Sequence, residues 1–144
     1  MPRFMKGEMF DSPGIHIVTA SSFISEEGTL VMSMGAGLSL KSRHPDLPKV
    51  FGSIIRDYCG HQGRYGLLLY GRHGILQTRT DMSGRMDPDL IKYGLKVLFS
   101  VAEGNPGLTY HVNHPGVSLN KMTIPEVDKV LNSLPANVWV WQKA

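Results

Sequence analysis

The chain has 144 residues, of which 42% are hydrophobic and 19% are charged. A chain of this length and composition buries a sizeable core in one domain, so disorder over most of its length is excluded. The formal net charge is +3 and no basic run is present, which disfavours an extended surface for nucleic acid. The single cysteine, Cys59, excludes an intramolecular disulfide and a multi-thiolate metal site.

The sequence carries no signal for a membrane or for export. No apolar stretch approaches the roughly 20 residues of a membrane-spanning helix, and Lys6, Glu8 and Asp11 stand where a signal peptide needs an apolar block. We therefore expect a soluble, cytoplasmic protein with no membrane partner. Glycine is abundant, at 16 residues, which suits backbone that turns tightly or approaches a ligand closely.

The first half of the chain predicts two strands followed by two helices. In chain order these are strands at 3–9 and 15–20, an irregular segment at 21–33, and helices opening at 34–37 and at 46. The second strand is dense in β-branched residues, which suits burial on both faces. Pro45 must interrupt the first helix, while Asp46 and Pro48 begin the next one and Gly60 ends it.

The second half predicts a hairpin and then two further helices that alternate with strands. The elements are hairpin strands at 65–70 and 75–80, a long helix from 88 that ends at 104–107, a strand at 108–112, a helix from 124, and a strand at 137–141. Asp87 and Pro88 are typical of a helix start. Thr123 and Glu126 have the spacing of a capping box, with Met122 able to pack on Val127.

This order of elements predicts an α/β fold. Strands and helices alternate over most of the length, which indicates a three-layer α/β/α domain, residues 1–144, with a mixed sheet and helices on both faces. In such sheets ligands bind beyond the carboxyl ends of the strands. That rule selects two loops, residues 21–37 and 113–122.

Gly35 and Gly37 lie at the opening of the first helix. Unpaired N–H groups and the positive end of the helix dipole favour an anion there, and glycine lets a phosphate come close. No Gly-Lys-Ser/Thr follows, which excludes a Walker phosphate-binding loop. The third glycine of the dinucleotide-binding fingerprint is missing, which excludes that class as well. The alternative is a plain tight turn.

The second loop, residues 113–120, follows a strand and precedes a helix, so we expect it at the same edge as the first. Asn113 and His114 in this loop could equally do no more than satisfy turn backbone. His111 and His114 point to opposite faces of an extended strand, and no Cys or acidic cluster completes a ligand set, so we expect no metal and no cofactor. The sequence contains no Gly-x-Ser-x-Gly elbow, so a serine catalytic triad is not supported.

Two further groups of side chains have alternative interpretations. Arg72, His73, Arg79 and Arg85 cluster in the hairpin and the loop after it, where they could serve an acidic substrate or form a solvated face. Trp139 and Trp141 alternate along the last strand, so their indoles face one side. They either pack in the core or leave one edge exposed as a platform for adenine.

The chain resembles a macro domain in several segments that occur in the right order. These are Lys6-Gly7-Glu8-Met9, the strand at 15–20, Met34-Gly35-Ala36-Gly37-Leu38-Ser39-Leu40-Lys41, and the loop around Gly116 before Pro125-Glu126-Val127. The similarity is nearest to the terminal ADP-ribose protein glycohydrolases. It spans essentially the whole chain and is close residue for residue only at 34–41.

The resemblance implies a cleft for ADP-ribose or an ADP-ribosylated molecule. Glu8 would accept a hydrogen bond from the adenine amine, residues 35–38 would face the distal ribose, residues 116–120 would wrap the diphosphate, and Trp141 would lie beside adenine. The implied ligand contacts are Glu8, Met9, Ser21, Ser22, Gly35, Ala36, Gly37, Leu38, His114, Gly116, Val117, Ser118, Leu119, Asn120 and Trp141.

The sequence also departs from the family pattern. An asparagine after the second strand is replaced by Ser21-Ser22 or Ser25-Glu26. The catalytic Lys and Asp of the subfamily correspond to Gly71 or Arg72 and to Asn120, and neither Arg nor Asn can supply the required nucleophile or base.

We therefore expect a module that binds ADP-ribose or a related adenine diphosphate. One alternative is a hydrolase of ADP-ribosyl esters or ADP-ribose phosphate, with His114 and Asn120 as catalytic candidates. A nucleic-acid-binding protein that uses residues 72–85 is the other.

Overall fold

The computed structural model describes residues 1–82, 85–115 and 124–143. Its centre is a six-stranded sheet of order β1-β6-β5-β2-β4-β3. The strands are β1 (Arg3–Lys6), β2 (Ile15–Ala20), β3 (Leu67–Tyr70), β4 (His73–Gln77), β5 (Tyr110–Asn113) and β6 (Val138–Gln142). Only β3 runs antiparallel to its neighbour, as the expected hairpin requires. The carboxyl ends of the other strands therefore share one edge.

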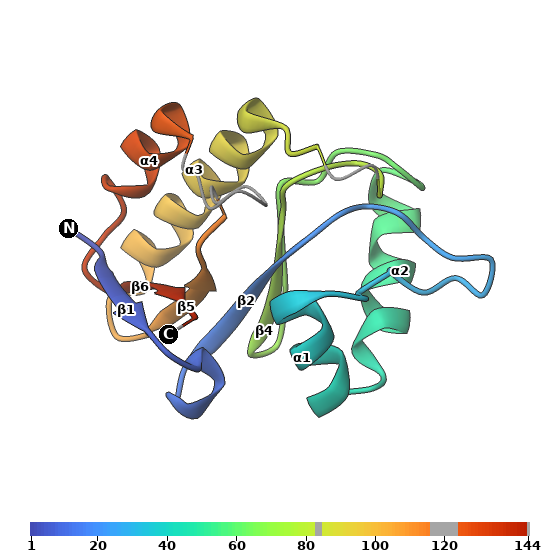
Figure 1. Cartoon of the computed structure of the whole chain (residues 1–144), viewed down its shortest axis with the longest axis horizontal. Helices are drawn as coiled ribbons and strands as arrows, with labels where there is room; N and C mark the ends of the chain where they lie inside the picture. The colour runs from blue at the N-terminus through green and yellow to red at the C-terminus, as the bar shows by residue number, and fades with distance from the viewer. Residues whose placement is uncertain (83–84, 116–123, 144) are drawn as a thin grey trace.

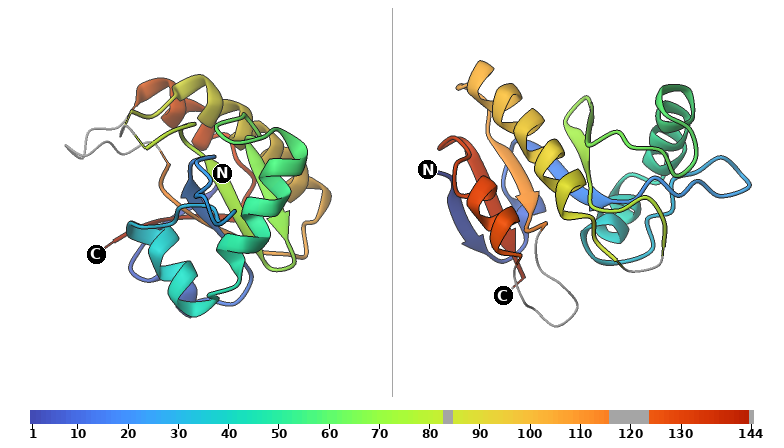
Figure 2. Two further views of the ribbon diagram at one scale, coloured as in Figure 1. Left: turned by 90° about the vertical axis from the view of Figure 1, so that its right-hand side faces the viewer. Right: turned by 90° about the horizontal axis from the view of Figure 1, so that it is seen from above.

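Helices cover both faces of this sheet (Figures 1 and 2). The helices are α1 (Gly35–Arg43), α2 (Leu47–Tyr58), α3 (Pro88–Gly104) and α4 (Pro125–Leu131), with a short 3₁₀ helix η1 (Met9–Asp11). α1 and α2 pack on one face, and α3 and α4 on the other. The expected three-layer α/β/α arrangement is confirmed. None of the described helices is long and apolar enough to cross a membrane.

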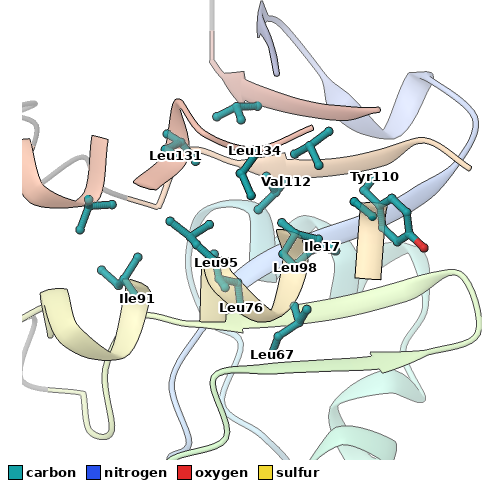
Figure 3. Packing of buried hydrophobic residues seen from close by; sticks show 14 residues of the cluster. Ile17, Leu67, Leu76, Ile91, Leu95, Leu98, Tyr110, Val112, Leu131 and Leu134 are labelled. Carbon is teal, nitrogen blue, oxygen red and sulfur yellow. The ribbon is translucent and has the colours of Figure 1, made fainter. Parts of the chain in front are cut away.

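The two cores follow from alternation along the strands. On β2, Ile17 packs with α3 and α4, whereas Val18 packs with α1 and α2. Figure 3 shows the first core, in which Leu95 and Leu98 of α3 meet Val112 of β5. Burial of these apolar side chains on both faces stabilises a sheet whose central strands have no solvated side.

Several element ends differ from the sequence expectation for local reasons. β1 stops at Lys6 rather than at residue 9, because Gly7 adopts a φ of +127° and Glu8 then begins η1. α3 begins as expected, with the Asp87 carboxylate accepting a hydrogen bond from Leu90 N at 3.2 Å.

The start of α4 does not follow the expected capping box. Ile124 occupies the N-cap position with extended backbone, and Pro125 is the first helical residue. A proline favours that first position and disfavours helical backbone in the residue before it. Thr123 and Met122 lie outside the described residues.

Candidate functional site

Two adjoining hollows lie along the shared carboxyl edge of the strands, on either side of the first turn of α1. The tryptophan hollow is lined by Gly7, Glu8, Met9, Phe10, Ala36, Ser39, Asn113, Trp141, Gln142 and Lys143. The arginine hollow is lined by Thr19, Ala20, Ser21, Val31, Met32, Ser33, Met34, Gly37, Arg79 and Met82. Ala36 and Gly37, consecutive in α1, face one hollow each. The helix opening predicted from its glycines therefore stands at the predicted edge.

The tryptophan hollow combines an aromatic ring with a carboxylate. Trp141 is 7% exposed, and its indole N–H donates to His111 Nδ1 at 3.0 Å, so the ring is held in a fixed orientation. Glu8 occupies the N-cap of η1, where Oε1 accepts from Phe10 N at 3.3 Å. Its other carboxylate oxygen accepts no hydrogen bond from the described residues. The hollow can thus offer a stacking surface and an acceptor to a planar ligand with an amine.

The arginine hollow contains a cationic side chain, Arg79, one of whose nitrogens has no partner among the described residues. Arg79 follows the end of β4 by two residues, and its Nε is buried without a hydrogen-bond partner among the described residues. Ser21, at the end of β2, is also buried, and its hydroxyl accepts from Phe23 N at 3.1 Å. A buried guanidinium N–H without an acceptor is costly unless an anion or a carbonyl supplies one. The hollow therefore suits an anionic or oxygen-rich ligand.

A pair of side chains joins β2 and β5 where the two hollows meet. Thr19 N donates to Asn113 Oδ1 at 2.9 Å, and Asn113 Nδ2 donates to Thr19 Oγ1 at 2.8 Å. Thr19 lines the arginine hollow and Asn113 lines the tryptophan hollow. This reciprocal pair fixes the spacing between the hollows.

Ser22, an expected ligand contact, belongs to a buried hydrogen-bond network. It is fully buried, its hydroxyl donates to Gly63 O at 2.6 Å, and it accepts from Gln77 Nε2 at 3.0 Å. Gln77 also donates to Arg79 O at 3.2 Å. This network therefore fixes the position of the Arg79 backbone. Ser22 itself lines neither hollow.

The remaining expected contacts lie outside the lining of both hollows or outside the described residues. Gly35 and Leu38 are exposed at the start of α1, outside the lining of both hollows. His114 Nε2 lies 3.6 Å from Asp128 Oδ1 of α4, so its side chain turns toward that helix. Burial lowers the pKa of His114, and Asp128 acts in the opposite direction. Residues 116–120, including Asn120, lie outside the described residues.

The two residues that the resemblance matched to the family lysine lie away from the two hollows. Gly71 and Arg72 form the turn between β3 and β4 and line a third hollow with Gly14 and Thr109, at the amino ends of the strands. They are thus on the opposite edge from Gly37. Of the basic side chains that the sequence analysis grouped in and after the hairpin, Arg79 is the one that lines the arginine hollow. The expected strand at 75–80 included Arg79, whereas β4 ends at Gln77, so the sequence alone did not place this side chain beyond the strand.

No group of three or more histidine, cysteine or acidic side chains is placed to hold a metal ion within the part of the chain that the structure describes. Comparison with sequence families finds no matching family model. No curated protein matches the chain either.

Solved structures, in contrast, match over the whole chain. The macrodomain of Thermus aquaticus DarG has a TM-score of 0.70 at 19% identity, covering 99% of this chain and 98% of that one. The macrodomain of Mycobacterium tuberculosis DarG has a TM-score of 0.70 at 17% identity, with coverage of 100% and 99%. Thermosipho africanus DarTG in complex with ADP-ribose has a TM-score of 0.68 at 17% identity, covering 98% of this chain and 41% of that one. The architecture and these likenesses together identify the fold of this chain as that of a macrodomain.

Proposed function

We propose that the chain binds ADP-ribose, or a molecule that carries an ADP-ribosyl group, along the carboxyl edge of its sheet. Adenine occupies the tryptophan hollow, where Trp141 offers a ring and Glu8 an acceptor. The ribose and diphosphate extend past the opening of α1 to the arginine hollow. The ADP-ribose in the similar DarTG structure supports this choice of ligand.

The buried Nε of Arg79 is the single observation that carries the proposal. It is a charged donor with no partner among the described residues, next to a glycine of α1 that leaves space for a ligand. A ligand with phosphate or ribose oxygens would supply an acceptor to the guanidinium when the side chain turns toward it. A purely apolar ligand would leave the donor unsatisfied.

The test compares two arginines by calorimetric titration with ADP-ribose. Arg79→Gln is expected to weaken binding roughly 10- to 150-fold, the equivalent of one charge-assisted hydrogen bond. Arg72→Gln is the matched control, because Arg72 lies at the opposite edge of the sheet. AMP lacks the distal part of the ligand, so its affinity should fall less in Arg79→Gln. Equal binding by Arg79→Gln and the parent would contradict the proposal.

A further inference from the structure

His111 of β5 has both ring nitrogens engaged although its side chain is fully buried. Nδ1 lies 3.0 Å from Trp141 Nε1, and Nε2 lies 3.0 Å from the Pro13 carbonyl. An indole nitrogen can only donate, so Nδ1 is the acceptor and Nε2 carries the proton given to Pro13. The contacts therefore fix both the tautomer and the neutral state of this histidine.

We propose that His111 is a positioning residue that holds the Trp141 indole in the tryptophan hollow, and that protonation of His111 releases the indole and weakens binding of an adenine nucleotide. An imidazolium has two N–H donors and no acceptor, so the charged ring faces the indole N–H with a second donor. Trp141 must then turn or leave a buried N–H unsatisfied. This inference rests on the proposed function, because it concerns the same hollow.

Of the groups around His111, the Pro13 carbonyl stabilises a positive charge, and the side chains do not. His16 of β2 stacks on it at 5.2 Å, and Trp139 meets it edge-on at 5.3 Å. Burial lowers the pKa of His111, His16 lowers it further, and the Pro13 carbonyl raises it. No described carboxylate forms an ion pair with His111.

The next layer of side chains is mostly basic, and its acidic groups are Asp11 of η1, which packs against β5, the η1 N-cap Glu8, and Asp46. The basic groups there are His73 beside His16, His44 whose ring is tilted against that of His73 at 4.3 Å, Arg43 over the Phe10 ring that touches His16, and Arg3 over Trp139. Asp46 acts on His73 rather than on His111. His111 therefore resists protonation until the solution becomes acidic. Its protonation then acts directly on Trp141, to which it is hydrogen-bonded.

The first arm of the experiment needs no ligand. Nitrogen-15 NMR of the free protein reports the tautomer of His111, and the indole proton of Trp141 reports its hydrogen bond. We expect a single Nε2–H tautomer at pH 7.5 and an indole signal that changes with the titration of His111 at lower pH. His16→Phe removes the titratable neighbour that stacks on His111. In this variant the indole signal of Trp141 should still change with the titration of His111.

The second arm measures the affinity for ADP-ribose and AMP at pH 7.5 and at a lower pH where the NMR arm shows His111 protonated, with circular dichroism to verify that the protein stays folded. Loss of the hydrogen bond should weaken both ligands about 2- to 12-fold at the lower pH. In His111→Asn the amide oxygen can stand near the Nδ1 position and does not titrate, so binding should persist at both pH values. His111→Leu should bind weakly at both.

The outcomes separate this inference from the function on which it rests. If neither ligand binds at pH 7.5, the proposed function fails, while the NMR arm still decides whether Trp141 follows His111. If the ligands bind with an affinity that does not change with pH, or if His111→Leu keeps the parent's profile, the positioning role is overturned. Trp141→Phe provides a second variant that lacks the donor, and it should bind weakly without the pH dependence.

Discussion

Gly37 lines the arginine hollow from the first turn of α1, and its surroundings can accept a side chain. A Cβ there would lie 3.7 Å from Met32 Cβ and 3.8 Å from Thr19 O, which are ordinary contacts. Gly37→Val should therefore fold normally while its methyl groups occupy the hollow. We expect affinity for ADP-ribose to fall roughly 100-fold or more, the equivalent of about 2.7 kcal/mol, in calorimetric titration. Unchanged affinity with an unchanged melting temperature would place the ligand elsewhere.

Glu8 provides a test of base selectivity. A carboxylate can accept from the exocyclic amine of adenine but not from the carbonyl of hypoxanthine, and an unmatched pair costs about 1–3 kcal/mol, or roughly 5- to 150-fold in affinity. ADP-ribose should outcompete its inosine analogue in the parent, and Glu8→Ala should abolish this preference. Asp11→Ala removes a carboxylate from the same η1 outside the hollow and should keep the preference. Competition titrations measure both, and equal affinities in the parent would refute an adenine acceptor at Glu8.

Arg79 also bears on catalysis. Its guanidinium stays protonated and cannot form the Schiff base available to a lysine. His114 faces Asp128 rather than the hollows. We therefore expect no detectable release of ADP-ribose from modified aspartate or glutamate side chains, as followed by chromatography of the products. Rapid turnover would exclude a pure binding module, and its loss in His114→Ala would assign the chemistry to that histidine.

At the scale of the element, α2 depends on a close approach of backbone. A Cβ at Gly52 would collide with the Gly28 carbonyl and lie 3.0 Å from Leu30 N. Leu30 N donates to Pro48 O at 2.8 Å, so the segment cannot easily move away. Gly52→Ala should lower the free energy of unfolding by about 1–3 kcal/mol in urea titration.

Gly104 at the end of α3 is the matched control for Gly52, because nothing lies within 4 Å of an added Cβ. Gly104→Ala should raise the free energy of unfolding by up to about 1 kcal/mol, since alanine loses less backbone freedom in a helix. Equal effects of the two substitutions would mean that α2 does not pack on the segment at 28–30 as described.

Some bounds of helices and strands could be predicted from local signals in the sequence, and others could not. β2 has the expected bounds of 15–20, because a dense run of β-branched residues between turn signals leaves few alternatives. α1 opens at Gly35 as its glycines indicate. Arg79 was not singled out, because its placement depends on where the hairpin turns and β4 ends. The contact of His111 with Trp141 depends on the pairing of β5 with β6, which no local pattern specifies.

At the scale of the whole molecule, a row of histidines crosses the sheet from β4 through β2 to β5. His16 is in register with both His73 and His111, and burial, aided by neighbouring histidines, lowers the pKa of His73 and of His111. The unfolded chain therefore binds protons more readily than the folded one. Stability should be complete above the unfolded histidine pKa of about 6.5 and fall as the pH drops below it.

Chemical unfolding between pH 7.5 and pH 5.5 measures this loss. The free energy of unfolding should decrease over that interval in the parent, and His73→Phe, which keeps a ring but cannot be protonated, should flatten the decrease. A free energy that stays constant across the interval in the parent would show that these histidines take up protons equally well in both states.

The parallel pairing of β1 with β6 decides how the two ends of the described chain can be tethered. β1 begins at the edge of the sheet opposite the cleft, whereas β6 ends at the cleft, where Lys143 lines the tryptophan hollow. A segment joined before Arg3 therefore leaves the fold on the far side from the ligand. A segment joined after Lys143 emerges beside the adenine position and crowds it. Attachment to a surface or a reporter through the first end should leave binding intact, while the same attachment through the second should obstruct it.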